Sequence, residues 1–147
     1  MEKEFITRNE NHNLNNNLLI LMEYKSCGNH VFADYINFYG DENELGTYIF
    51  NLMIQAIEKT SMKIVHKKLC ILKEEDNTPP GFTSVLLLDE SHFTSHCYSQ
   101  KGLLCFDIFT CGGTDTMKIM DEVNDILINK FSDIKCTYLQ NHKRFNY

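Results

Sequence analysis

Several features that mark particular classes of protein are absent from this sequence or rare in it. Basic residues are few: 14 Lys and Arg stand against 20 Asp and Glu, so the formal net charge is -6 at pH 7. Nucleic acids and anionic membrane surfaces are bound by clustered Lys and Arg that neutralise phosphate, so this charge argues against both kinds of partner. It favours a small-molecule ligand, including a cationic one.

Long apolar runs and paired cysteines are missing too. No apolar run approaches the ~18 residues that span a bilayer, so we expect a soluble protein. The cysteines include no C-x-x-C pair and follow no evident secretory signal, which argues against a disulfide framework and against a metal cluster. We expect reduced thiols in the cytoplasm, most of them buried as small apolar side chains. They are Cys27, Cys70, Cys97, Cys105, Cys111 and Cys136.

The rest of the composition is that of one ordinary domain. The chain has 147 residues, of which 43% are hydrophobic, enough to bury a core. Residues 1–17 are dominated by Asn, Glu and other polar side chains, so we expect a disordered tail there and a single domain over 18–147. The apolar run 18–24 predicts a buried first strand that ends in a turn at 27–29.

Apolar periodicity predicts the remaining elements. Helical spacing over 45–57 and again over 119–131 predicts two amphipathic helices. Strands are expected at 62–72, from 85 to 88, at 103–110 and at 134–139, with a polar turn at 73–81 that contains both prolines. Candidate N-cap residues precede the helices, namely Asp41, Asn43, Thr114 and Asp115. This order predicts an α+β two-layer sandwich, in which two helices cover one face of a mostly antiparallel sheet.

A polar stretch, DESHFTSH at 89–96, follows directly after the apolar run 85–88. By itself it is typical of a solvated loop whose Ser and His side chains satisfy nearby backbone groups. Cys111, just before Gly112 and Gly113, is by itself typical of a buried thiol. A Ser, a His and a Cys at the ends of elements can also converge on a pocket, and spacing alone does not decide between these interpretations.

Four segments, in order, resemble the signature segments of the prokaryotic-type S-adenosylmethionine decarboxylase proenzyme family, whose members depend on a pyruvoyl group. They are Gly81-Phe82-Thr83-Ser84, Glu90-Ser91-His92, His96, and Asp107-Ile108-Phe109-Thr110-Cys111-Gly112. An earlier Gly28-Asn29-His30 is similar to the Gly-x-His of that family. The resemblance covers about residues 28–112, and four ordered matches are specific where any single one would be weak.

The resemblance implies self-processing. The Ser91 hydroxyl is expected to attack the Glu90 carbonyl, giving an ester in place of the peptide bond. β-Elimination of that ester leaves dehydroalanine at position 91, and hydrolysis then converts it to a pyruvoyl group with release of ammonia. The products would be a β chain of residues 1–90 and an α chain of residues 91–147. By the same resemblance, His96 is the proton acceptor in processing, and Thr83 supplies a hydroxyl that polarises the processing site.

The resemblance also implies how turnover proceeds. The substrate amine forms a Schiff base with the pyruvoyl carbonyl, carbon dioxide leaves, and the Cys111 thiol donates a proton to the former α-carbon. Tyr98 and Gln100 are the candidate substrate-binding residues, because the family's Thr-Trp-Pro-Glu reads Cys97-Tyr98-Ser99-Gln100 here. We expect His92 to orient the turn and His30 to be structural. A homodimer whose active sites lie near the interface is implied as well.

The expected reaction converts S-adenosylmethionine to its decarboxylated form for polyamine (spermidine) biosynthesis, and two alternatives stay open. A decarboxylase of the same fold acting on arginine or ornithine would need acidic groups in its pocket, and Glu23, Asp34 and Asp107 are candidates. A non-catalytic, uncleaved relative would instead serve as a regulatory partner of an active enzyme. Intact Ser91, His96 and Cys111 argue against that second alternative.

Overall fold

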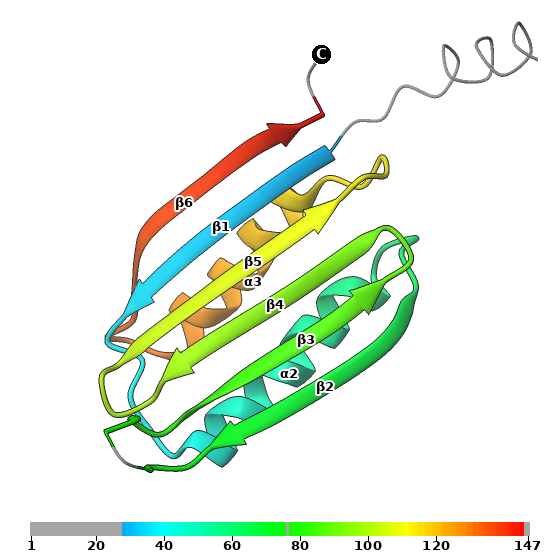
Figure 1. Ribbon diagram of the computed structural model, residues 1–147. Coiled ribbons are helices and arrows are strands. Elements are labelled where there is room, and N and C mark those ends of the chain that lie inside the picture. The colour runs from blue at the N-terminus through cyan, green and yellow to red at the C-terminus, as the bar shows by residue number, and fades with distance from the viewer. Residues whose placement is uncertain (1–27, 76, 146–147) are drawn as a thin grey trace, which may run out of the picture.

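The computed structural model describes residues 28–75 and 77–145, which form a six-stranded sheet with two helices (Figure 1). Every pair of neighbouring strands is antiparallel, in the order β2-β3-β4-β5-β1-β6. The elements are β1 (Gly28–Ile36), α2 (Glu42–Glu58), β2 (Ile64–Leu72), β3 (Gly81–Leu88), β4 (Ser91–Tyr98), β5 (Leu103–Thr110), α3 (Thr116–Lys130) and β6 (Lys135–Arg144).

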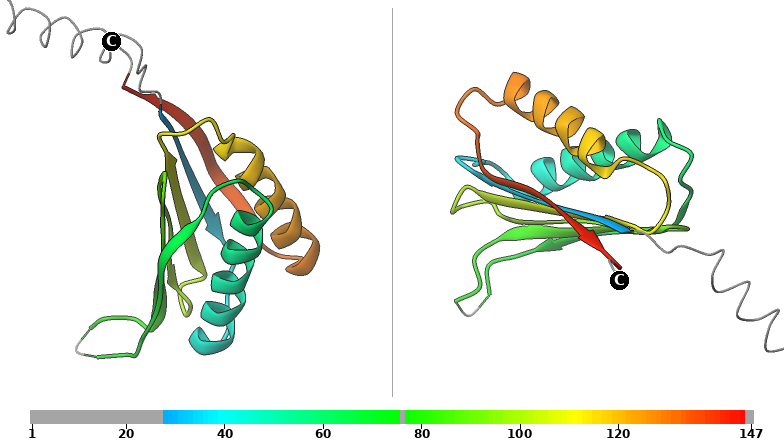
Figure 2. Two further views of the ribbon diagram at one scale, coloured as in Figure 1. Left: turned by 90° about the vertical axis from the view of Figure 1, so that its right-hand side faces the viewer. Right: turned by 90° about the horizontal axis from the view of Figure 1, so that it is seen from above.

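Both helices lie on the same face of the sheet, so the described residues form two layers (Figure 2). Helix α2 packs on β2, β3 and β4, while α3 packs on β1, β5 and β6. This arrangement confirms the α+β sandwich predicted from the sequence. No helix in the described part of the chain is both long and apolar enough to cross a membrane.

The helices form where the apolar periodicity predicted them, and each begins at an aspartate. The Asp41 carboxylate accepts hydrogen bonds from the backbone N–H groups of Asn43 and Glu44, at 2.9 and 3.0 Å. Asp115 caps α3 in the same way, accepting from Met117 and Lys118. Each cap satisfies backbone donors that have no partner inside the helix.

The core lies between the helices and the sheet. Alternate residues of β3, β4 and β5 point toward the helices and are fully or almost fully buried, as the period of two of a strand requires. The largest of these side chains are Phe82, Leu86, Phe93, Leu104, Phe106 and Ile108. We call the opposite side, which no helix covers, the open face; its half-buried or exposed residues include His30, Asp34, His92, Thr94, His96, Cys105 and Asp107.

Two strands differ from the prediction. The stretch 91–98, interpreted by itself as a solvated loop, is strand β4, which pairs with β3 on one side and β5 on the other. Strand β1 at 28–36 was not predicted, and the strand expected at 18–24 and the tail expected at 1–17 lie outside the described residues. Strands β1 and β4 both carry polar side chains on the open face, so the alternation of apolar residues is hard to recognise in their sequences.

The cysteines also differ from the prediction that most would be buried. Of those described, Cys97 is buried, Cys105 and Cys136 are partly exposed, and Cys70 and Cys111 are exposed. Burial raises the pKa of the Cys97 thiol to about 12, so that thiol stays protonated and unreactive. Cys111 is exposed because its strand has already ended at Thr110.

Candidate active site

The Glu90–Ser91 peptide bond lies in the tight turn that joins β3 to β4. Leu88 pairs directly with Ser91, so only residues 89 and 90 make the connection. The φ angle of Ser91 is 148°, a region of backbone conformation that is almost restricted to glycine. Holding a serine there costs on the order of 1–3 kcal/mol. This backbone strain lies at the residue whose peptide bond to Glu90 is expected to break.

The carbonyl oxygen of Glu90 accepts two hydrogen bonds from one residue. The backbone N–H of Cys111 donates to it at 3.0 Å, and the Cys111 Sγ–H donates at 3.3 Å. These contacts follow from strand pairing, because Ser91 opposes Thr110 across β4 and β5. The two strands lie side by side in the sheet (Figure 1). Two donors on one carbonyl oxygen polarise the bond and stabilise negative charge that develops there.

The Glu90 side chain is held at the same place. Thr110 Oγ1 donates to Glu90 Oε2 at 3.2 Å, and the backbone N–H of Gly112 donates to Thr110 Oγ1 at 3.0 Å. A Cβ atom on Gly112 would overlap with the Glu90 carboxylate, whereas one on Gly113 would meet nothing within 4 Å. Gly112 is therefore the glycine that lets the carboxylate approach the backbone.

Ser91 also contacts a histidine. Its Oγ lies 3.2 Å from His92 Nδ1, and His92 Nε2 lies 3.0 Å from Asp107 Oδ1. The same carboxylate oxygen is 2.8 Å from His30 Nε2. Sequence reasoning gave His92 and His30 only supporting roles, although both lie in the segments that resemble the family's signatures.

A second group of predicted residues lies farther along β4. Thr83 Oγ1 is 2.7 Å from His96 Nδ1, since these residues pair directly across β3 and β4. The other ring nitrogen of His96, Nε2, is buried and has no hydrogen-bond partner among the described residues. Burial lowers the pKa of His96 below its ordinary value, so the neutral imidazole is favoured.

Tyr98 completes this second group. Its ring meets the His96 ring edge-on, with centroids 4.6 Å apart. Both residues line a mostly apolar cavity of about 350 Å³ on the open face, together with Asp34 and Cys105. Gln100, the other residue predicted to bind substrate, is exposed in the turn after β4 and does not line this cavity.

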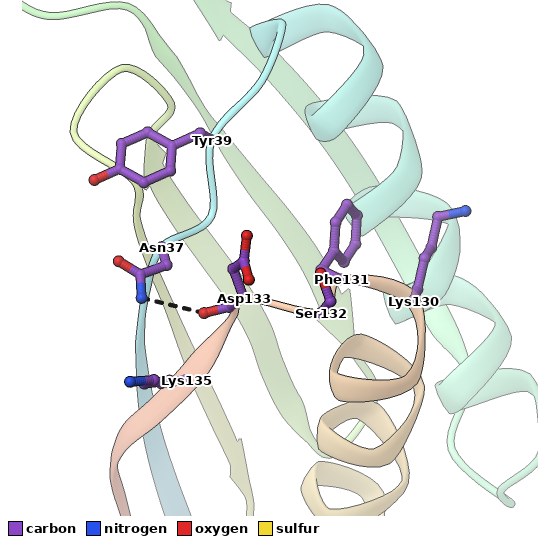
Figure 3. Close-up of a pocket in the computed structure, with 7 residues that line it drawn as sticks. All are labelled: Asn37, Tyr39, Lys130, Phe131, Ser132, Asp133 and Lys135. Atoms are coloured by element: carbon purple, nitrogen blue, oxygen red, sulfur yellow. Dashed lines mark hydrogen bonds between the residues drawn. The ribbon is translucent and has the colours of Figure 1, made fainter.

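A larger hollow of about 640 Å³ lies near the ends of β1 and α3 (Figure 3). Its lining residues are Asn37, Tyr39, Lys130, Phe131, Ser132, Asp133 and Lys135. Asn37 follows β1, whose other end pairs beside Thr110, so this hollow lies at the far end of the sheet from Ser91. None of the residues predicted to react lies in it, and we do not assign the active site to it.

The two groups of candidate residues are separate within one chain. Glu90, Ser91 and Cys111 meet at one end of the sheet. His96 is five positions after Ser91 on β4, and at ~3.3 Å per residue the two lie about 16 Å apart. The chain alone thus supplies an activated peptide bond and, elsewhere, a neutral histidine above a cavity.

Comparison with known proteins shows the family of this chain. The family model described as S-adenosylmethionine decarboxylase matches residues 29–140. The chain belongs to this family. Two curated members, both named S-adenosylmethionine decarboxylase proenzyme, are each 30% identical over 112 residues. The one from Sulfurihydrogenibium sp. (strain YO3AOP1) is matched over 76% of this chain and 80% of its own length, and the one from Clostridium botulinum (strain Langeland) over 76% and 92%.

A solved structure supports the fold. The adenosylmethionine decarboxylase from Aquifex aeolicus VF5 superposes with a TM-score of 0.56 at 23% identity, covering 84% of this chain and 92% of that one. The family match includes all the candidate residues, from Thr83 to Cys111.

Proposed function

We propose that this protein is a self-processing, pyruvoyl-dependent S-adenosylmethionine decarboxylase. It cleaves itself between Glu90 and Ser91 into a β chain of residues 1–90 and an α chain of residues 91–147. The observation that carries the proposal is the Glu90 carbonyl oxygen, which accepts both the backbone N–H and the thiol of Cys111 beside a strained Ser91. These residues fit a pyruvoyl precursor, because an ester on serine Oγ can undergo β-elimination to dehydroalanine, which hydrolyses to pyruvoyl.

The first step replaces an amide by an ester. A planar amide is a poor electrophile, so attack by Ser91 Oγ on the Glu90 carbonyl carbon needs help from its surroundings. The two donors from Cys111 stabilise the oxyanion as it forms. Breaking the C–N bond also frees Ser91 from its φ of 148°, so strain present before the reaction is released during it.

The second step, elimination of the ester, needs a base, and His96 is suited to it. The Thr83 hydroxyl holds Nδ1, and Nε2 is left without a partner among the described residues. At about 16 Å along β4, however, His96 does not reach Ser91 of its own chain. We therefore propose a homodimer in which His96 of the partner subunit serves each Ser91, with the uncovered open face toward the interface.

In turnover, the pyruvoyl group supplies an electron-poor carbonyl that accepts the electron pair released with carbon dioxide. The chain's own residues do the rest. The Cys111 thiol, beside position 91, holds the proton that returns to the former α-carbon. Tyr98, in the cavity wall, offers an aromatic face for a nucleobase. Gln100 could offer amide hydrogen bonds to hydroxyl groups only of a substrate that extends beyond this cavity. The product would enter polyamine (spermidine) synthesis by aminopropyl transfer.

We place this chemistry in the cytoplasm. None of the five cysteines in the described ranges is bonded to another, which suits a reducing compartment.

One observation is the reason to test a cationic amino acid as an alternative substrate. Asp34 lines the cavity beside His96, where a carboxylate would attract the side chain of arginine or ornithine. Asp107, the other described acidic candidate, is already engaged by two histidines.

The first experiment is the intact mass of the purified protein under denaturing conditions. Two fragments that meet between positions 90 and 91, the second carrying pyruvoyl, support the proposal, and Ser91→Ala should stay a single chain. The same sample is then given S-adenosylmethionine, arginine or ornithine while carbon dioxide is measured. Release from S-adenosylmethionine alone supports the assigned substrate. A wild-type chain that stays uncleaved for days supports the regulatory-partner alternative instead.

The dimer is tested by complementation. His96→Ala and Cys111→Ala chains, each inactive alone, are co-expressed with different tags and the mixed dimer is purified. If His96 acts across the interface, one of the two sites in the mixed dimer contains every reacting group, and activity returns. A mixed dimer without activity, or a monomer that is fully active by light scattering, contradicts the shared site.

A further inference from the structure

The reacting serine lies at one end of a continuous chain of polar contacts on the open face. Ser91 Oγ is 3.2 Å from His92 Nδ1, and His92 Nε2 is 3.0 Å from Asp107 Oδ1. The same oxygen is 2.8 Å from His30 Nε2, and His30 Nδ1 is 3.0 Å from a guanidinium nitrogen of Arg144. Four contacts therefore connect residues from β4, β5, β1 and β6 to the bond that is expected to break.

The donor and the acceptor of each hydrogen bond can be assigned by starting from Arg144, the outermost residue in this series of contacts. A guanidinium only donates, so Arg144 donates to His30 Nδ1, and the His30 proton lies on Nε2. His30 then donates to Asp107 Oδ1. An ionised carboxylate only accepts, so His92 also donates to Asp107 from its Nε2. The remaining nitrogen of the neutral His92 ring, Nδ1, therefore presents a lone pair to Ser91 Oγ.

We infer that His92 is the general base of the first processing step and that Asp107 is its positioning residue. Together with Ser91 they make a Ser–His–Asp arrangement whose nucleophile is the residue being processed. The inference rests on the proposed function and adds to it, because His96 serves the later elimination and leaves the first proton without an acceptor.

The step balances without any co-reactant. The Oγ–C bond forms between Ser91 and the Glu90 carbonyl carbon while the Oγ proton passes to His92 Nδ1. The C–N bond between the two residues then breaks, and His92 returns the proton to the departing Ser91 nitrogen. An ester and a free amine replace the amide, no electrons are gained or lost, and His92 is neutral again at the end.

Aromatic packing holds the base in place. The Phe109 ring lies 5.9 Å from the His92 ring and 5.4 Å from the His30 ring, measured between centroids. The Arg144 guanidinium lies over the same Phe109 ring, at 5.3 Å. His92, Phe109 and His30 are successive neighbours across β4, β5 and β1, so strand register sets their spacing.

His30, His92 and Asp107 also place ligand atoms within 4.8 Å of one another, the spacing of a metal site. Proton transfer explains the contacts better. Arg144 puts a positive charge 3.0 Å from His30, which opposes a cation, and both Nε2 atoms carry the protons that a metal would displace.

The test follows processing of the full-length precursor with time by intact mass, with and without hydroxylamine, which cleaves an ester but not an amide. We expect His92→Ala to slow cleavage by about 10²- to 10⁴-fold and to accumulate no hydroxylamine-sensitive ester. His96→Ala should accumulate that ester. Added imidazole should partly restore His92→Ala, which only a folded protein lacking its base would show. Leu87→Ala is the matched control, because Leu87 pairs with His92 across β3 and β4 and is exposed.

A second variant guards against loss of folding. Asp107→Asn should slow the same first step by about 100-fold or more, since an amide favours the wrong tautomer of His92, and its thermal midpoint should stay near that of the wild type. Processing should be unchanged by a chelator. Wild-type processing rates in His92→Ala, ester accumulation in that variant, or loss of processing on chelation with recovery on adding zinc would each overturn the inference. A wild-type chain that never cleaves overturns the proposed function itself.

Discussion

Cys111 holds the carbonyl oxygen of Glu90 through two different atoms, its backbone nitrogen at 3.0 Å and its sulfur at 3.3 Å. The backbone donor is present whatever side chain stands at position 111. The thiol is the weaker donor of the two, and it is the group that substitution removes. The two expected roles of this residue, in processing and in turnover, can therefore be separated.

Cys111→Ala should cleave itself at a normal or near-normal rate and then turn over poorly. The backbone N–H still stabilises the oxyanion, whereas the proton donor for the former α-carbon is gone, and loss of such a group costs about 10²- to 10⁴-fold. Intact mass measures the first quantity and product formation the second. Cys70→Ala, an exposed thiol on β2, is the control. Loss of cleavage in Cys111→Ala would mean that its role is misassigned.

Gly112→Ala and Gly113→Ala should differ sharply although they are neighbours. A methyl group on Gly112 overlaps with the Glu90 carboxylate and must displace it from Thr110, whereas one on Gly113 enters open space. We expect self-cleavage at least ten-fold slower for Gly112→Ala and close to wild type for Gly113→Ala, measured by intact mass with time. Equal rates would show that the position of the Glu90 side chain does not matter for processing.

Thr83 should matter through its hydroxyl. Thr83→Val keeps the shape of the side chain but removes the hydrogen bond to His96 Nδ1, so we expect slower processing and a build-up of the ester. Thr83→Ser keeps the hydroxyl and should process at least as fast as the wild type. Hydroxylamine sensitivity measures the ester in both. The hydroxyl has no part in processing if valine and serine behave alike.

The protonation of His96 should be shifted toward acid. Because burial lowers its pKa, we expect the ring to titrate below its ordinary midpoint of about 6.5 in an NMR titration of the uncleaved Ser91→Ala protein, with His96→Gln for assignment. Between the lowered pKa of His96 and about pH 6.5, the unfolded chain binds more protons than the folded one. The free energy of unfolding should therefore rise with pH from the lowered pKa up to about 6.5. A midpoint at or above 6.5 contradicts the desolvated site.

The sequence predicts the parts of this fold whose patterns are simple. Both helices carry a clear apolar stripe behind a capping aspartate, and β5 is a mostly apolar run bounded by Gly102 and Gly112. Strand β4 was not predicted because Ser, Thr and His make up most of it, and because Ser95 shares the buried face with Phe93 and Cys97. Its pairing with β3 and β5 is what shows it to be a strand. Tertiary pairing overrides a weak local preference in such cases.

The candidate site shows the same limit. Resemblance identified Glu90, Ser91 and Cys111, but their contact depends on the register between β4 and β5, which no spacing in the sequence reveals. The distance of His96 from Ser91 would have followed at once had 91–98 been predicted as a strand. With that stretch interpreted as a loop, the expectation of a homodimer rested on the resemblance alone and had no geometric argument behind it.

The order of the strands has a consequence for the protein after cleavage. Strand β1 belongs to residues 1–90, yet it lies between β5 and β6, which both belong to residues 91–147, and β3 stays paired with β4 across the break. Strands of the two product chains are therefore interleaved, and the chains cannot separate without breaking the pairing of the sheet. An uncut subunit is a single polypeptide, whereas the same subunit after the proposed cut is two, and both must associate for the sheet to form. The melting temperature should therefore depend more strongly on protein concentration for the processed protein than for uncleaved Ser91→Ala.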